Sequence, residues 1–208
     1  MEKSKILFVG EEISFASRYR VEHFREQLIL NGYASKFIQM DQAEQEKIEE
    51  YTAVVMYRCS KLMEAEMLAD RAKAAKIPVY YDVDDLVFDY EKISGLHFLK
   101  GSEYSDFRTT TDRIHGCMEF CDGYFTSTET LAEEIREEFP GKPVVINRNC
   151  MSMEMEVLSH EAVEQTDKDK DRIYIGYLSG SKTHDQDFVQ VEAALLEVME
   201  RHPEVYLK

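Results

Sequence analysis

Residues 172–188 read RIYIGYLSGSKTHDQDF and contain, in this order, a strand, a loop of small residues and the beginning of a helix. The apolar and aromatic run at 173–178 favours a buried strand, because such side chains pack well in a sheet. Asp185 or Asp187 can cap the helix that follows. Strand, loop and helix in succession form the repeating unit of α/β proteins, so this stretch predicts an α/β fold.

The chain before this stretch repeats the same alternation. It predicts strands at 5–9, 34–39, 53–57, 79–81, 123–126 and 143–147, and helices at 18–31, 62–75 and 104–121. A further helix carries Leu131 and Ile135, and Thr126 with Glu129 offers a capping box for it. This order predicts a Rossmann-like, doubly wound and mostly parallel sheet with helices on both faces.

Two domains of unequal size are expected. Residues 1–160 form the first, 161–171 a polar linker, and 172–208 the start of a second domain. Only one short strand, at 205–207, follows the helix that carries Phe188, so we expect the second sheet to be incomplete. Its open edge predicts a longer molecule, a partner or self-association into a homo-oligomer.

The composition excludes several classes of partner. The 208 residues include 25 Lys and Arg against 41 Asp and Glu, a formal charge of -16 that repels a nucleic acid backbone. No apolar run approaches the roughly 20 residues of a membrane span, and no signal peptide is recognisable. Four dispersed cysteines predict reduced thiols and a cytoplasmic location, with Cys117 and Cys121 packed in the core.

Acidic residues follow the predicted strand at 79–81. In open α/β sheets ligands bind beyond the carboxyl ends of the strands, which is where Asp82, Asp84 and Asp85 are expected. Such carboxylates can ligate a divalent cation, act as a general base or act as a nucleophile. They can equally cap a turn and face solvent.

Cations and small residues suggest two anion sites. Arg18, Arg20 and Arg25 lie at the start of the first helix, after a loop that begins at Gly10 and lacks the GxGxxG dinucleotide pattern. The second loop combines backbone donors, hydroxyls and a cation before a helix, which suits a diphosphate although the Walker A spacing is missing. Its residues are Ser179, Gly180, Ser181, Lys182, Thr183 and His184.

Five segments, taken together and in order, resemble the glycosyltransferase family 4 group, whose architecture consists of two Rossmann-like domains (GT-B). They are SFASRYRVEHFREQL, PVYYDVDDLVFD, CDGYFTSTETLAEEI, PVVINRN and IGYLSGSKTHDQDF, and they span nearly the whole chain. The resemblance implies an N-terminal acceptor domain and a C-terminal domain that binds a nucleotide-diphosphate sugar. It also implies retaining sugar transfer to a glycan, lipid or protein acceptor, with no cofactor and no obligatory metal.

The resemblance also implies roles for single residues. Asp84 and Asp85 take the catalytic position, although many members have His where this chain has Asp84. The expected contacts to the donor phosphates are Gly10, Ser179, Gly180, Ser181 and Lys182, and the expected contacts to the acceptor are Arg18, Arg20 and Ser127. The family's basic pair and acidic motif for the donor are not found before Lys208, so little activity is expected from this chain alone.

Two other readings stay open. A non-catalytic carbohydrate- or protein-binding module of the same fold would fit the sequence, and binding of acceptor without donor would identify it. A haloacid-dehalogenase-like phosphatase would use Asp82 and Asp84 with Mg²⁺, although that pair usually follows the first strand of the core rather than the fourth.

Overall fold

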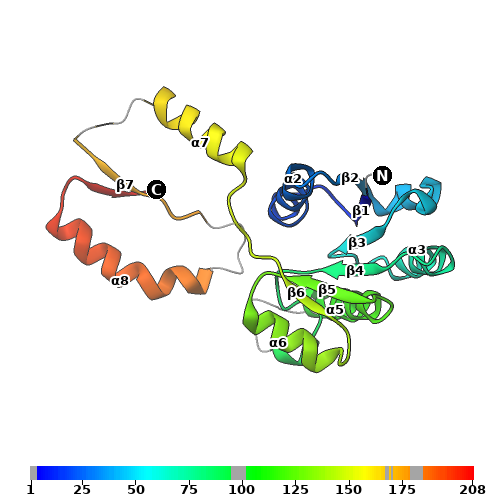
Figure 1. Cartoon of the computed structure of the whole chain (residues 1–208). Coiled ribbons are helices and arrows are strands. Elements are labelled where there is room, and N and C mark those ends of the chain that lie inside the picture. Colours follow the sequence, from blue (N-terminus) through cyan, green and yellow to red (C-terminus); the bar gives the residue numbers. More distant parts are fainter. Residues whose placement is uncertain (1–3, 95–101, 167–168, 170, 179–184) are drawn as a thin grey trace. The chain divides into compact units, whose positions relative to one another are not determined.

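A computed structural model describes residues 4–94, 102–166, 169, 171–178 and 185–208 (Figure 1). The chain divides into two compact units, and the division along the chain falls between Met153 and Glu154. Unit 1 contains the described residues up to Met153, and unit 2 contains those from Glu154 onward.

Unit 1 is built on a parallel six-stranded sheet. In the order in which they pair, the strands are β2 (Ala34–Gln39), β1 (Lys5–Gly10), β3 (Ala53–Tyr57), β4 (Val79–Asp82), β5 (Gly123–Thr126) and β6 (Val144–Ile146). Every pairing is parallel, so all six carboxyl ends meet at one edge. The predicted mainly parallel α/β sheet is confirmed, and it is compatible with a Rossmann-like fold.

The two faces of this sheet bury different clusters. Side chains alternate along β1: Leu7 and Val9 enter the larger core, and Phe8 enters the smaller one. The larger core is covered by α3 (Leu62–Ala74), α5 (Ser102–Glu119) and α6 (Glu129–Glu138), and the smaller one by the helix that follows β1. The predicted core positions Cys117 and Cys121 are buried in the larger core.

The helix after β1 is continuous but changes its pitch. It consists of α1 (Phe15–Ser17), a π-helical turn η1 (Arg18–Glu22) and α2 (His23–Leu30). The Ser14 hydroxyl accepts a hydrogen bond from the Ser17 backbone N–H and so caps its beginning. A π turn inserts an extra residue and re-aims the side chains around it, here Arg20.

Shorter helices complete unit 1. The 3₁₀ turns η2 (Met40–Gln45) and η3 (Ile48–Glu50) connect β2 to β3, and α4 (Tyr90–Ile93) follows the acidic loop after β4. One predicted cap is wrong: Thr126 belongs to β5, and the N-cap of α6 is Thr128, whose hydroxyl accepts a hydrogen bond from the Leu131 N–H. Thr126 pairs with Ile146 of β6, so it is part of the sheet and does not cap the helix.

Unit 2 contains α7 (Met153–Gln165, of which Met153 itself belongs to unit 1), β7 (Ile173–Ile175), α8 (Asp185–Arg201) and β8 (Val205–Leu207), with β7 and β8 paired in parallel. Helix α7 continues to Gln165 and so extends into the segment 161–171 that is predicted as a polar linker. The predicted buried strand is wrong: Ile173 and Tyr174 are exposed, since a sheet of two described strands has too few neighbours to cover them.

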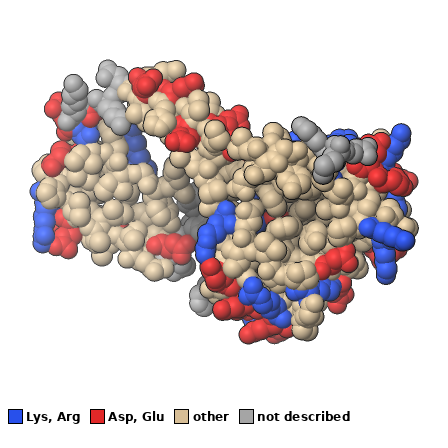
Figure 2. Space-filling model, in the orientation of Figure 1, with Lys and Arg blue, Asp and Glu red and all other residues tan. Residues whose placement is uncertain are grey.

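No helix among the described residues has the length and apolar character needed to cross a membrane. In the view of Figure 2, acidic and basic side chains are interspersed with uncharged ones.

Candidate functional site

The carboxyl edge of the unit 1 sheet has a topological switch point between β1 and β3. The chain leaves β1 to form β2 on one side, and then returns to form β3 on the other side of β1. Helices that leave neighbouring strands in opposite directions open a crevice there, which is where open α/β sheets bind their ligands. The candidate site is therefore sought at the ends of β1 and β3 and of the strands beside β3.

Backbone hydrogen bonds order this edge beyond the strands themselves. The Arg58 N–H donates to the Asp82 carbonyl at 3.1 Å, and the Val83 N–H donates to the Phe125 carbonyl at 3.1 Å. Further along the sheet, the Asn147 N–H donates to the Thr126 carbonyl at 2.7 Å. The side chains that follow β3, β4 and β6 are therefore held on a fixed backbone.

A buried ion pair joins the π turn to the end of β4. Arg20 Nε lies 2.7 Å from Asp82 Oδ1, and Arg20 Nη2 lies 2.9 Å from Asp82 Oδ2. Burial raises the pKa of Asp82 to about 6, although the charge of Arg20 and its hydrogen bonds to the carboxylate act in the opposite direction. Because its side chain is buried against Arg20, Asp82 stabilises the carboxyl edge of the sheet from within and does not face solvent.

A second ion pair lies closer to the surface. Arg58 Nη2 lies 2.6 Å from Asp84 Oδ1, and the same guanidinium contacts the Asp85 carboxylate. Burial lowers the pKa of Arg58, but the charge of Asp84 outweighs that effect and the net shift is upward. Arg58 has a φ of 45°, a left-handed conformation that costs a non-glycine residue free energy and that turns the chain at the end of β3.

Asn149 links the two ion pairs. Its side-chain oxygen accepts a hydrogen bond from Arg20 Nη1 at 3.0 Å, and its amide nitrogen lies 3.4 Å from Asp84 Oδ2. Arg20 Nη1 also donates to the Asn147 carbonyl. We call Arg20, Arg58, Asp82, Asp84, Asp85 and Asn149 the carboxyl-edge cluster.

A cavity of about 510 Å³ adjoins this cluster at the switch point. Its lining includes Glu11 and Ser14 after β1, Tyr57 and Arg58 at the end of β3, and Thr110 of α5. We call it the switch-point cavity. A volume of this size matches the roughly 300–1,000 Å³ of typical ligand pockets.

The Tyr57 hydroxyl has no hydrogen-bond partner in the described structure, although the residue is only 4% exposed. Burial raises the pKa of Tyr57, so the phenol stays protonated and can donate. An unpaired buried hydroxyl costs about 1–3 kcal/mol, and most buried polar groups avoid that cost. Tyr57 also lines the switch-point cavity, so a ligand that displaces the atoms covering this hydroxyl would supply the missing partner.

Glu11 uses its carboxylate within the protein. It accepts hydrogen bonds from the Lys61 N–H at 2.6 Å and from the Ser60 hydroxyl at 2.8 Å, and also from the Ser60 N–H. These donors precede α3, so Glu11 caps that helix from the loop after β1. The bonds fix the cavity wall at the β1 end.

The structure brings some of the site residues predicted from the sequence into the cluster and places others elsewhere. Asp84 and Asp85 lie in the cluster, and Gly10 ends β1, where an added Cβ would lie 3.2 Å from the Phe37 ring. Arg20 also belongs to the cluster, and because it is fully buried it lies beneath the cluster's exposed members. Ser127 donates a hydrogen bond to the Asp84 carbonyl at 3.4 Å, while Arg18 is exposed and stacks over the Phe15 ring.

The predicted phosphate loop, Ser179, Gly180, Ser181 and Lys182, lies outside the described residues. Three members of the site, Tyr57, Arg58 and Asn149, were not predicted. Tyr57 and Arg58 stand at the end of a predicted strand and Asn149 shortly after the last one. The rule that pointed to Asp84 would therefore have found them too.

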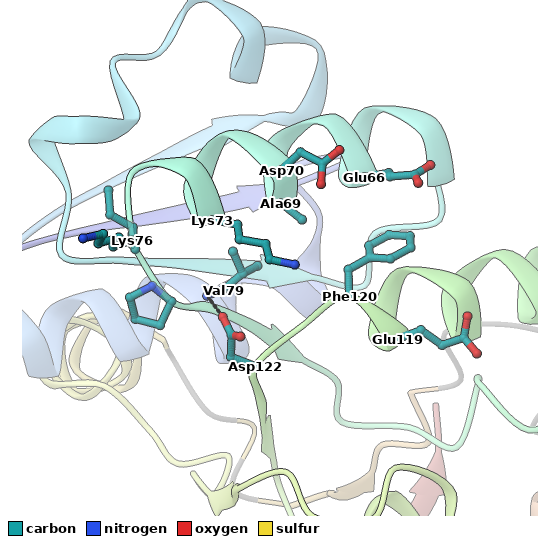
Figure 3. A pocket seen from close by; sticks show the side chains of 11 residues that line it. Glu66, Ala69, Asp70, Lys73, Lys76, Val79, Glu119, Phe120 and Asp122 are labelled. Atoms are coloured by element: carbon teal, nitrogen blue, oxygen red, sulfur yellow. Dashed lines mark hydrogen bonds between the residues drawn. The ribbon is translucent and has the colours of Figure 1, made fainter.

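Another cavity, of about 580 Å³, lies at the opposite edge of the sheet (Figure 3). Lys73 and Asp122 line it, and the Asp122 carboxylate accepts a hydrogen bond from the Val79 N–H at 2.8 Å, where β4 begins. This position is at the amino ends of the strands, away from the switch point, so we do not assign the candidate site to it.

No arrangement of three or more His, Cys, Asp or Glu side chains suited to a metal ion occurs in the described part of the chain. Comparison with known protein families gives no match to any family model. Comparison with curated proteins gives no match either.

Proposed function

We propose that this chain is a glycosyltransferase that uses a nucleotide-diphosphate sugar and binds a carbohydrate-type acceptor at the carboxyl edge of unit 1. The observation that carries the proposal is the unpaired, buried hydroxyl of Tyr57, a residue that lines the switch-point cavity. The resemblance of the sequence to glycosyltransferase family 4 supplies the reaction class.

The polar groups around the cavity suit a ligand with many hydroxyls. Tyr57 lines the cavity and can donate one hydrogen bond, and Asp84 and Asp85, which contact the lining residue Arg58, can accept several, as expected for recognition of a sugar ring. Because Arg58 offsets one of their two negative charges, the carboxylates can accept hydrogen bonds from hydroxyl groups without presenting two uncompensated charges.

In the proposed reaction, the acceptor hydroxyl oxygen forms the new bond to the anomeric carbon of the donor sugar. The bond from that carbon to the diphosphate oxygen breaks, and the nucleoside diphosphate leaves with the electron pair. We assign removal of the hydroxyl proton to Asp85, whose side chain is 63% exposed. Asp84 and Arg58 are proposed to orient the acceptor hydroxyl. Gly10, at the end of β1, is proposed to contact the donor phosphates.

One observation favours the second candidate function, a carbohydrate-binding module without catalysis. Arg58 contacts both Asp84 and Asp85, and carboxylate oxygens that accept hydrogen bonds from a guanidinium are less available to take a proton from a substrate. Such a module would bind the acceptor in the same cavity and would not turn over a nucleotide sugar.

The Tyr57→Phe variant tests the proposal. Removal of an unpaired hydroxyl should raise the free energy of unfolding by about 1 kcal/mol, while loss of a ligand hydrogen bond should weaken acceptor binding by about tenfold. Tyr33→Phe, at an exposed tyrosine away from the cavity, is the matched control and should change neither quantity.

Binding would be measured by calorimetric titration of the whole chain with a panel of neutral oligosaccharides, and transfer with UDP- and GDP-sugars. Transfer that falls in Asp85→Asn supports the enzyme, and oligosaccharide binding without transfer supports the module. A Tyr57→Phe variant that is less stable and binds as the wild type does would contradict both.

A further inference from the structure

A hollow of about 220 Å³ lies between η2 and α3, on the outside of unit 1. Three buried side chains line it: Met40, Ala43 and Leu68, which are 2%, 4% and 2% exposed. They belong to the larger core of the unit, so the hollow reaches the core surface at this point. It contains none of the residues of the carboxyl-edge cluster.

Two exposed methionines also line the hollow. Met63 and Met67, four positions apart on α3, are 67% and 52% exposed, while Ala65 and Leu68 of the same helix are buried. Residues four apart share one face of a helix, so the two thioethers lie on the same side of α3. Methionine side chains adapt to different partners and are common on protein-binding surfaces.

The rim of the hollow is acidic. Asp41, Glu44 and Glu64 line it and are exposed, and within the described residues none of the three forms an ion pair or side-chain hydrogen bond. The cation among the lining residues, Arg71, is already engaged: its guanidinium donates to the carbonyls of Ala43 and Glu46. Three negative charges therefore stand around an apolar floor without a described partner.

We propose that this hollow, which we call the methionine groove, binds a basic amphipathic helix of a partner protein. One bulky apolar side chain of that helix inserts between Met63 and Met67, and its Lys or Arg residues pair with Asp41, Glu44 and Glu64. This is the helix-in-groove mode of recognition, with charge complementarity around a central apolar anchor. The formal charge of -16 speeds the encounter with a basic partner.

The chain's own helices do not fit this groove. Helix α7 carries Glu154, Glu156, Glu161 and Glu164 and has neither Lys nor Arg. Helix α8 carries five acidic residues and a single basic one, Arg201. Either helix from a second copy would bring like charges to Asp41, Glu44 and Glu64, so the occupant is a different, basic protein.

The test titrates the whole chain with a labelled amphipathic peptide of about 18 residues, a length that can form a stable helix. Its apolar face carries leucines, and its polar face carries lysines in one version and glutamates in the other. The lysine peptide should bind, and the glutamate peptide should not. The methionine methyl groups, labelled with ¹³C and followed by NMR, should shift for Met63 and Met67.

Two triple variants with equal net charge distinguish peptide binding at the groove from general electrostatic attraction to the acidic protein. Asp41→Lys/Glu44→Lys/Glu64→Lys should bind the lysine peptide at least about tenfold more weakly, whereas Glu91→Lys/Asp106→Lys/Glu133→Lys should bind nearly as the wild type does. All six positions are exposed, so both variants should fold. Met63→Gln/Met67→Gln should weaken binding without any change in charge.

Three results would overturn the proposal. They are equal losses in the two triple variants, binding of the glutamate peptide, and peptide binding with no shift of the Met63 and Met67 methyl groups. Self-association of the chain that Met63→Gln/Met67→Gln abolishes would show that a second copy fills the groove instead.

Discussion

Arg20 and Asp82 form a two-point ion pair, with distances of 2.7 and 2.9 Å, although their side chains are only 0% and 2% exposed. The pair connects the π turn after β1 to the end of β4, across the strand β3 that lies between them. Through Asn147 and Asn149 it also holds the chain that leaves β6. One buried guanidinium thus fixes three segments from distant parts of the sequence.

The first prediction concerns removal of one partner from this pair. Arg20→Met should lower the free energy of unfolding by about 3–5 kcal/mol, because it leaves the Asp82 carboxylate buried without its cation. The double variant Arg20→Met/Asp82→Leu should be more stable than the single one, because both charges are gone. Urea denaturation of the three proteins measures this, and equal or additive losses would contradict it.

The second prediction concerns pH. The folded pKa of Asp82, about 6, lies above its ordinary value of 3.8 because the group is buried. Folding therefore favours the protonated form, so the group's contribution to stability is complete below about pH 4 and is lost as the pH rises through 6. The loss amounts to about 3 kcal/mol, the free-energy equivalent of two pKa units.

The measurement compares wild type with Asp82→Asn by urea denaturation between pH 4 and 7. The difference between their unfolding free energies isolates Asp82 from other acids, such as Glu46, whose pKa is lowered by its hydrogen bond to Lys36. Wild type should gain stability relative to the variant as the pH falls from 7 to 4. A difference that stays constant over this range would refute the assignment.

The third prediction uses the left-handed backbone of Arg58. Arg58→Ala and Arg58→Gly both lose the ion pairs with Asp84 and Asp85, so they differ only in the cost of a φ of 45°. The glycine variant should be more stable than the alanine variant by about 1 kcal/mol, because only glycine adopts this conformation freely. Thermal or urea unfolding would show the order.

Lys73, within α3, is the matched control for this comparison. There Ala should be more stable than Gly by about 1 kcal/mol, since the backbone is helical. If the alanine variant were also the more stable one at position 58, the left-handed backbone there would not cost the protein free energy.

The sequence predicts the sheet of unit 1 well because the relevant signals are local. A continuous apolar run such as Leu7, Phe8, Val9 indicates a strand that is covered on both faces, and breaks such as Gly32 and Pro78 separate the elements. Asp84 and Asp85 could be predicted as site residues for the same reason: they directly follow a strand. That the chain reverses at β1 and β3, however, depends on the order of pairing, which no local pattern contains.

Other parts of the site depend on contacts between distant segments. Arg20 has the residue type of a ligand-binding cation, and only the pairing across the sheet shows that it is buried against Asp82. The unpaired state of the Tyr57 hydroxyl is likewise a property of its surroundings. In unit 2, the apolar run at 173–175 has the composition of a buried strand, yet burial requires covering layers that the described structure does not provide.

The last prediction compares two glycines whose added Cβ atoms would meet different neighbours. At Gly123, in β5, a Cβ would lie 2.9 Å from the Pro143 carbonyl oxygen and 2.8 Å from Pro143 Cγ, atoms of a rigid ring and of the adjoining backbone. Gly123→Ala should therefore lower the unfolding free energy by about 1–3 kcal/mol, because β5 and β6 would have to move apart.

At Gly116, in α5, the nearest atom is a Leu62 methyl carbon at 2.9 Å, which can rotate away. Gly116→Ala should be neutral or slightly stabilising, since alanine favours a helix by about 1 kcal/mol over glycine. Urea denaturation of the two variants tests the packing of β5 against β6, and a Gly123→Ala protein as stable as wild type would contradict that packing.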